Sequence, residues 1–315
     1  MPENILKEEP LFKVRTYATS ANIGPGYDCA GMALKISNDY EVYPSKKGCS
    51  CVSFKGKDIE GIAKDDNNLV CRTIIKTIEK KYGHDFKKHQ KMIELKCSIK
   101  VPVERGLGSS STAVAAGLLI ANKIYGLNYS IKELFNIGLE IEPHPDNLAP
   151  CMAGGFVISY KNDEGTYDFK KIKIKKNFKI LLVVPDLKIN TNQARKLVPD
   201  NFPKADVIFN LANFAILTEC LNTGEIGRLH EFIGDKIHQP YRKSIYTDSM
   251  AIVEMLCRKY KIGAAISGSG STVVAFAANE RLTEIKNKII LEIKNKYPAF
   301  KFLITEISDK GSYCF

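Results

Sequence analysis

The chain lacks the cysteine patterns of disulfide-stabilised and zinc-ribbon proteins. It has nine cysteines among 315 residues, an odd number, and no two of them form a C-x-x-C pair. Small disulfide frameworks and structural zinc sites both need regular cysteine spacing. The two nearest cysteines, Cys49 and Cys51, are separated by a single residue. We therefore expect ordinary thiols in a reducing cytoplasm.

Long apolar runs are also missing. No run approaches the roughly 20 residues that a membrane-spanning helix requires. The N-terminal residues MPENILKEEP are polar and acidic, which is not the pattern of a signal peptide. The 44% hydrophobic and 26% charged contents are ordinary for globular proteins, and this length is typical of two domains. The sequence thus predicts a cytoplasmic two-domain protein with no membrane partner.

The net charge of +11 does not follow a nucleic-acid-binding pattern. Its lysine clusters, at residues 87–91 and 170–176, have no interleaved aromatic residues. Solvated lysine-rich faces explain such clusters, and the same positive field attracts a phosphorylated small molecule. A nucleic-acid ligand stays an alternative that salt-dependent filter binding tests.

Hydrophobic periodicity predicts mixed elements in both halves of the chain. A basic stretch, residues 170–177, precedes a continuous apolar strand, and we place a domain boundary near residue 176. Strands are predicted at residues 12–15, 39–43, 92–101, 154–160, 179–186 and 301–307. Helices are predicted at residues 69–83, 130–142, 204–222, 225–235, 247–260 and 280–296.

A glycine–serine run opens one further helix. Residues 106–112 read GLGSSST and precede AVAAGLLIANKIYGL, which is apolar on nearly every face and predicts a buried helix. Glycines and serines at a helix N-terminus, where backbone N–H groups are free and the dipole is positive, suit a phosphate chain. The run is not the common lysine-containing phosphate loop, because no lysine follows the glycines. It is not a dinucleotide-binding fingerprint either, because no third glycine lies three residues beyond Gly108.

Three further segments concentrate polar residues in stiff loops. Residues 22–28 read NIGPGYD, residues 142–147 read EPHPDN and residues 265–272 read AISGSGST. Together with the glycine–serine run, these segments resemble the motifs of the GHMP kinases, over residues 18–276. The first two resemble the homoserine kinases of that family more than its galactokinases or mevalonate kinases. Pro143 stands where those enzymes have glycine, and Ser271 where proline is usual.

The resemblance implies an α+β protein with the two-domain GHMP kinase fold. Residues 1–176 would form an ATP-binding domain like the second domain of ribosomal protein S5, and residues 177–315 a ferredoxin-like domain. The implied reaction is ATP-dependent phosphorylation of L-homoserine to O-phospho-L-homoserine in threonine biosynthesis. The implied ATP-binding residues are Asn68, Pro102, Val103, Glu104, Arg105, Gly106, Leu107, Gly108, Ser109, Ser110, Ser111 and Thr112.

The same resemblance assigns roles around the phosphate loop. Ser110 and Glu142 would hold Mg²⁺, with Glu140 as the alternative ligand, and both would act in catalysis together with Asn147. Mevalonate kinases have an aspartate that acts as a base at the position of Asn147. Since this chain has asparagine there, no general base is evident, and a phosphate oxygen is left to take the proton of the substrate hydroxyl. Homoserine needs cations for its carboxylate and an anion for its ammonium group. The implied substrate-binding residues are Asn22, Asp28, His144, Asn147, Arg195 and Arg242, with the two arginines on the carboxylate and Asp28 on the ammonium group.

Two other functions fit the same fold. One is a kinase for another small alcohol such as mevalonate, which the residue at position 147 and a substrate panel would distinguish. The other is a non-catalytic ligand sensor, against which the complete GLGSS loop, Ser110 and Glu142 argue. The resemblance implies a small-molecule substrate and no nucleic acid, and it leaves a homodimer possible.

Overall fold

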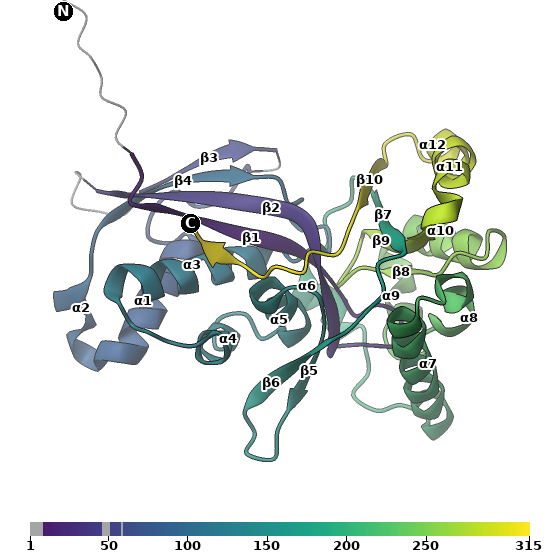
Figure 1. The fold of residues 1–315 in the computed structure, drawn as a ribbon, viewed down its shortest axis with the longest axis horizontal. Helices are drawn as coiled ribbons and strands as arrows, with labels where there is room; N and C mark the ends of the chain where they lie inside the picture. The colour runs from purple at the N-terminus through teal and green to yellow at the C-terminus, as the bar shows by residue number, and fades with distance from the viewer. Residues whose placement is uncertain (1–8, 46–50, 58) are drawn as a thin grey trace, which may run out of the picture.

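The computed structural model describes residues 9–45, 51–57 and 59–315. The statements above on the first eight residues and on Cys49 concern residues outside this part of the chain. The described residues form two β-sheets, each covered by helices, that lie side by side along the longest axis of the molecule (Figure 1). The α+β class predicted from the sequence is confirmed by this arrangement.

The first sheet has the strand order β11-β1-β2-β4-β3, and β5 joins it through β2 and continues to β6. All pairs are antiparallel except β3 with β4. Its strands are β1 Phe12–Ala21, β2 Ala30–Pro44, β3 Cys51–Gly56, β4 Ile93–Ile99, β5 Phe156–Lys161, β6 Tyr167–Ile172 and β11 Tyr313–Cys314. Helices cover one face of this sheet (Figure 1): α1 Leu69–Tyr82, α2 Phe86–His89, α3 Ser109–Tyr125, α4 Ile131–Leu139 and α5 Pro145–Ala153.

The second sheet is antiparallel with the order β10-β7-β9-β8. In chain order its strands are therefore fourth, first, third and second, which is the ferredoxin-like arrangement. The strands are β7 Phe178–Val184, β8 Ala264–Ile266, β9 Val273–Ala278 and β10 Lys301–Thr305. The helices are α6 Thr191–Lys196, α7 Lys204–Thr223, α8 Leu229–Phe232, α9 Gln239–Arg242, α10 Thr247–Arg258, α11 Leu282–Glu284 and α12 Ile290–Lys296.

One apolar core joins the two domains. Ile180, Leu182 and Phe276 of the second sheet share a buried cluster with Met32 and Leu107 of the first domain. The opposite face of the second sheet packs separately against α10, α12 and the π-helical turn Ile285–Ile289. Because burial of apolar surface drives folding, this shared core holds the two domains together along their contact.

Several elements differ from the sequence-based expectation. The predicted helix over residues 130–142 is confirmed as α4, which ends at Leu139. The sequence did not predict the next helix, α5, which begins at Pro145 because proline suits a first helical position. The predicted helix over 225–235 is a 3₁₀ turn followed by the short α8. The short last strand, β11, was not predicted from the sequence, and it pairs with β1 of the first sheet. No helix in the described ranges is both long and apolar enough to span a bilayer.

Candidate active site

A cavity of about 310 Å³ lies where the two domains meet. Its walls come from the loop after β1, the glycine–serine run, the starts of α1 and α5, α6, α9 and the loop between β8 and β9. Every residue that the sequence assigned to the site lines this cavity, except Pro102 and Arg105. The structure therefore brings together side chains that are up to some two hundred residues apart, such as Asn22 and Arg242.

The glycine–serine run wraps the N-terminus of α3, which begins at Ser109. Gly108 has φ 66°, and a Cβ there would lie 1.9 Å from Thr19 Oγ1. Gly106 has φ 74°, and its Cβ would lie 2.2 Å from the Ser267 carbonyl oxygen. Only glycine permits both the positive φ and the close approach. The backbone therefore turns tightly enough to aim the positive end of α3 into the cavity.

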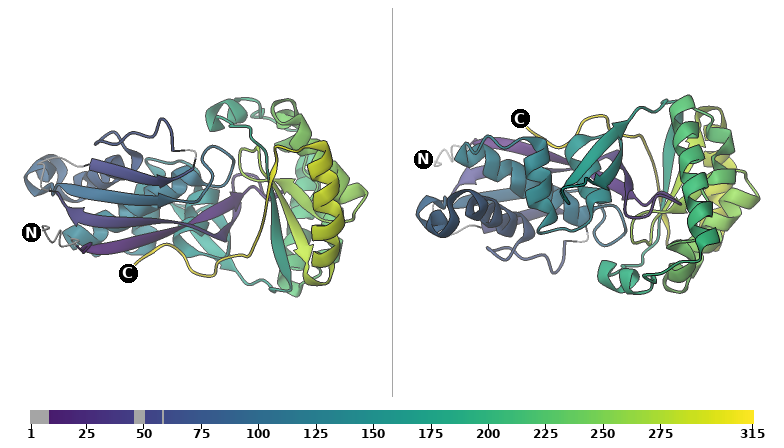
Figure 2. Two further views of the ribbon diagram at one scale, coloured as in Figure 1. Left: turned by 90° about the horizontal axis from the view of Figure 1, so that it is seen from above. Right: turned by 90° about the horizontal axis from the view of Figure 1, so that it is seen from below.

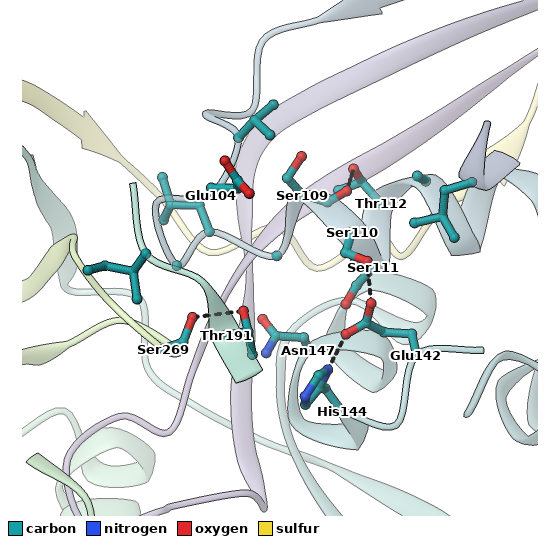
Figure 3. A pocket seen from close by; sticks show the side chains of 18 of the residues that line it. Glu104, Ser109, Ser110, Ser111, Thr112, Glu142, His144, Asn147, Thr191 and Ser269 are labelled. Atoms are coloured by element: carbon teal, nitrogen blue, oxygen red, sulfur yellow. Dashed lines mark hydrogen bonds and ion pairs between the residues drawn. The ribbon is translucent and has the colours of Figure 1, made fainter. Parts of the chain in front are cut away.

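Ser110, Glu142 and His144 form a hydrogen-bonded chain in the cavity wall (Figure 3). The Ser110 hydroxyl donates to one Glu142 oxygen, and His144 Nδ1 bonds the other. Burial opposes ionisation of Glu142, but the hydrogen bonds from His144 and Ser110 outweigh it and lower the pKa of this carboxyl. Glu142 is thus an ionised carboxylate at neutral pH.

Glu140, the alternative to Glu142, lies outside the cavity. Its carboxylate pairs with Lys80 at 2.7 Å and approaches Lys76, and its side chain is 40% exposed. The two glutamates lie differently because α4 ends before Glu140 and the chain then turns, which brings the Glu142 side chain to Ser110.

The cavity lining also contains an ion pair. Both nitrogens at the tip of Arg195 donate to Asp28, Nη1 at 3.0 Å and Nη2 at 2.7 Å. Asp28 belongs to the loop after β1 and Arg195 to α6, so the pair links the two domains. Asp28 has φ 55°. Positive φ is uncommon in residues other than glycine and indicates a functional or structural constraint at this position.

Arg242 is buried beside this pair with part of its guanidinium unsatisfied. Its Nε donates to the Ala194 carbonyl at 2.9 Å, and Nη2 donates to the Tyr27 hydroxyl at 3.3 Å. Nη1 has no partner among the described residues. A buried cationic donor without an acceptor is costly, so this nitrogen is suited to bind an anion from a ligand.

Asp146 is a cavity residue that the sequence reasoning did not assign. It is 2% exposed and follows Pro145 in the first turn of α5. Burial, and then the negative charge of Asp28, raise the pKa of the Asp146 carboxyl to about 7. Each carboxylate opposes ionisation of the other, and a cation bound between them would relieve this repulsion. The signal in the sequence was the EPHPDN segment itself, in which Asp146 lies between the assigned residues His144 and Asn147.

The amide side chains at the site are already engaged. Asn22 accepts from the Asp28 N–H at 3.0 Å and donates to the Gly268 carbonyl at 2.7 Å, so it joins two loops of the cavity. Asn147 accepts from the Thr19 hydroxyl at 2.8 Å. Asn68 caps α1 through Val70 N–H and donates to the Ala63 carbonyl. Contacts of these amides with a ligand stay predictions.

Arg105 does not line the cavity, and its guanidinium is engaged by other residues. Its Nε donates to the Pro185 carbonyl at 3.1 Å and its Nη2 pairs with Asp186 at 2.8 Å. These partners follow β7, so the side chain ties the loop before the glycine–serine run to the second domain. Any contribution of Arg105 to a phosphate site would come from its backbone.

Asp235, which the sequence reasoning also missed, supports the charged end of the cavity. Its carboxylate accepts from the Gln239 and His238 N–H groups at 2.7 and 3.1 Å, and from Asn210 Nδ2 at 2.8 Å. His238 in turn donates through Nε2 to the Gly24 carbonyl and stacks on Tyr27. Asp235 thus fixes both the start of α9, which carries Arg242, and the loop that carries Asp28.

The donor set suits magnesium more than a transition metal. The described ranges contain no group of three or more His, Cys, Asp or Glu side chains arranged to hold a metal ion. Ser110 and Glu142 instead present a hydroxyl and an ionised carboxylate in contact with each other. Magnesium typically takes one or two protein oxygens and completes its shell with substrate phosphates and water. The two residues therefore fit a magnesium site beside a bound phosphate chain.

Comparison with known proteins identifies relatives along the whole chain. The family models for the GHMP kinases N terminal domain and the GHMP kinases C terminal match residues 68–155 and 217–311. The chain is 38% identical to the homoserine kinase of Clostridium kluyveri over 282 residues, 90% of each protein. It is 34% identical to the homoserine kinase of Clostridium acetobutylicum over 292 residues, 92% of this chain and 94% of that one.

Solved structures show the same fold. A homoserine kinase from Cytophaga hutchinsonii superposes with a TM-score of 0.81 at 23% identity, covering 96% of this chain and 97% of that one. A mevalonate diphosphate decarboxylase from Staphylococcus aureus superposes with a TM-score of 0.66 at 15% identity, covering 96% and 97%. The predicted two-domain fold is confirmed by these matches.

Proposed function

We propose, from the premise that this chain belongs to the GHMP kinases and within them to the homoserine kinases, that it phosphorylates L-homoserine. The γ-phosphoryl group of ATP is transferred to the side-chain hydroxyl, giving O-phospho-L-homoserine and ADP. This step belongs to threonine biosynthesis. The assignment to the family rests on the similarity to the curated homoserine kinases. The geometry of the cavity supports homoserine as the substrate.

The observation that carries the proposal is the charge arrangement at one wall of the cavity. Arg195, Arg242 and two carboxylates, Asp28 and Asp146, lie within one small space, and one Arg242 nitrogen is unpartnered. An α-amino acid presents a carboxylate and an ammonium group on one carbon. The arginines suit the former and the aspartates the latter, whereas mevalonate and galactose have no ammonium group to offer.

The phosphate end of the reaction belongs to the glycine–serine run. Free N–H groups at the start of α3 and the serine hydroxyls donate to phosphate oxygens. Ser110 and Glu142 would hold Mg²⁺, which would neutralise charge on the phosphate chain. The apolar lining formed by Phe54, Leu69 and Val103 suits the nucleotide base.

Positioning supplies most of the catalysis in phosphoryl transfer. Asn147 cannot accept a proton, so its amide orients the substrate hydroxyl, and the proton passes to a phosphate oxygen. His144 holds the Glu142 carboxylate through Nδ1 and so fixes its direction toward Ser110. Seven of the cysteines in the described part of the chain form no disulfide, which suits work in the reducing cytoplasm.

A substrate panel tests the proposal. ADP release is measured with purified protein, ATP and Mg²⁺ against L-homoserine, L-serine, mevalonate and galactose. We expect clear turnover of homoserine and little of the others, since serine is one carbon shorter and the other two have no ammonium group. Turnover of mevalonate or galactose with none of homoserine would overturn the assignment.

A further inference from the structure

The segment that leads to Arg195 has no regular structure of its own. Residues 185–190 connect β7 to α6, the short helix that carries Arg195, and we call them the β7–α6 connector. None of the connector residues lies in a helix or strand, so contacts with neighbouring loops must hold them in place. The position of Arg195 in the cavity therefore depends on what holds the connector. Figure 2 shows α6 beside the boundary between the two domains.

Arg105 holds the first two residues of the connector. Its side chain is buried, with 5% exposure, and comes directly before the glycine–serine run. Nε donates to the Pro185 carbonyl at 3.1 Å, and Nη2 pairs with Asp186 at 2.8 Å. The third nitrogen, Nη1, donates to the Val103 carbonyl of its own loop at 3.3 Å. One guanidinium thus joins the loop before the glycine–serine run to the start of the connector.

Ser271 holds the middle of the connector from the loop between β8 and β9. Its hydroxyl donates to the Leu187 carbonyl. Ser271 is itself fully buried, and its carbonyl accepts from the Ser249 hydroxyl at 2.7 Å, which fixes it to α10. A proline at this position, where the motif usually has one, would have no hydroxyl to donate. This contact with the connector is therefore a feature of the sequence of this chain.

The connector and the two loops form a closed ring of hydrogen bonds. The connector bonds the loop before the glycine–serine run a second time, because the Ile189 N–H donates to the Glu104 carbonyl at 3.1 Å. That loop in turn bonds the loop between β8 and β9, because the Arg105 carbonyl accepts from the Thr272 N–H at 3.2 Å. Each of the three segments is thus bonded to the other two, which fixes the connector relative to the glycine–serine run.

We propose that Arg105 and Ser271 are positioning residues for homoserine. Neither lines the cavity, so neither touches a ligand there. Both hold the connector, and the connector sets the position from which Arg195 meets the substrate carboxylate. This inference rests on homoserine as the substrate. The glycine–serine run would contact ATP through its own backbone and hydroxyls, so loss of either side chain should weaken homoserine binding more than ATP binding.

Steady-state kinetics of Arg105→Gln and Ser271→Ala test the proposal from two different loops. Each variant should raise the KM for homoserine about tenfold and change the KM for ATP by less than about twofold. Arg281→Gln is the matched control, because Arg281 also bonds a carboxylate and a carbonyl, those of Glu284 and Tyr260, and does not line the cavity. It should keep both native KM values. Equal rises in the two KM values, or an unchanged KM for homoserine in either test variant, would overturn the proposal.

A double variant tests whether Arg105 acts through Arg195. In a chain that already carries Arg195→Ala, the connector has no arginine left to position. Adding Arg105→Gln should then raise the KM for homoserine by less than about twofold, although it raises this KM about tenfold in the native chain. The full tenfold rise in both backgrounds would indicate an effect that does not pass through Arg195, and it would overturn the proposal.

Amide hydrogen exchange measures the hold on the connector without any turnover. Loss of the Arg105 side chain should let the connector open more often, so peptides that contain Ile189 should exchange roughly tenfold faster in Arg105→Gln. Exchange in Arg281→Gln should match the native rate. A native chain that does not phosphorylate homoserine would overturn the proposed function and this inference with it. Native turnover of homoserine with unchanged exchange at the connector in Arg105→Gln would overturn the inference alone.

Discussion

Arg195 and Asp28 form a two-bond ion pair that spans the cavity from the second domain to the first, with N–O distances of 3.0 and 2.7 Å. A zwitterionic amino acid carries the same two charges on neighbouring groups. Its carboxylate can take over from Asp28 on Arg195, and its ammonium group from Arg195 on Asp28. Without substrate, the Arg195 guanidinium and the Asp28 carboxylate therefore hold each other in place and neutralise each other's charge. When homoserine binds, each of them exchanges this partner for a substrate group of the same charge, so little electrostatic energy is lost.

Arg195→Ala and Arg242→Ala should raise the KM for homoserine more than the KM for ATP. A carboxylate contact distant from the reacting hydroxyl stabilises ground and transition states alike. Loss of a hydrogen bond to a charged group costs about 1.5–3 kcal/mol, which is roughly ten- to a hundredfold in binding. Steady-state kinetics with each substrate varied in turn measure both constants. Arg228→Ala, on an exposed arginine far from the cavity lining, is the control.

Ser110→Ala and Glu142→Gln should each lower kcat strongly and leave the fold intact. Both remove an oxygen ligand for Mg²⁺ whose effect is greatest in the transition state. Loss of one such contact costs about a hundredfold or more in rate. Glu140→Gln is the matched control, because Glu140 pairs with Lys80 outside the cavity. A crippled Glu140 variant beside a normal Glu142 variant would reverse the ligand assignment.

Asp146 should make homoserine use depend on pH. Its carboxyl titrates near 7 in the folded protein, and only the ionised form attracts the substrate ammonium group. The kcat/KM for homoserine should therefore rise with pH through about 7 in the native protein. Asp146→Asn should lower kcat/KM and flatten this rise. An unchanged pH profile in the variant would assign the titration to another group.

The contribution of Asp146 to folding stability should depend on pH in the opposite direction to its contribution to kcat/KM. The folded pKa of Asp146, about 7, lies above the usual value of 3.8, so the folded state binds the proton more tightly. The contribution of this group to the free energy of unfolding is present at low pH and is lost as pH rises toward 7. Urea unfolding at pH 5 and pH 8 should thus show a smaller loss of stability for Asp146→Asn than for the native chain.

Asp235→Asn should weaken homoserine binding although Asp235 does not line the cavity. The variant keeps one acceptor oxygen but loses the charge that gathers the N–H groups at the start of α9. Arg242 and the loop of Gly24 then lose their fixed positions, and the KM for homoserine should rise about tenfold. A positioning role predicts a nearly constant KM for ATP. Equal losses for both substrates would indicate general destabilisation.

Local patterns were sufficient to predict the turn of the glycine–serine run and the buried helix α3 that follows it. The requirement for glycine at positions 106 and 108 arises from positive φ angles and close neighbours, and the buried helix follows from its uninterrupted apolar sequence. These features depend on a few adjacent residues. The pairing of β11 with β1 could not be predicted in the same way, because it joins the two ends of the chain.

The side-chain contacts around the site could not be predicted for the same reason. Arg105 was assigned to ATP from its place in the motif, and its side-chain partners Pro185 and Asp186 lie eighty residues further along. The importance of Asp146 and Asp235 depends on burial and on neighbouring charges, which three-dimensional packing sets. Sequence motifs thus identified which segments form the cavity, while the structure determines which way each side chain points.

The central claim is that the cavity phosphorylates the hydroxyl of an α-amino acid. Mass spectrometry of a reaction containing the purified chain, ATP, Mg²⁺ and L-homoserine tests it most directly. The account predicts a product heavier than homoserine by one phosphoryl group, formed in equal amount to ADP and absent with Glu142→Gln. ADP formation without a phosphorylated homoserine, or no consumption of homoserine by a folded protein that binds ATP, would contradict it.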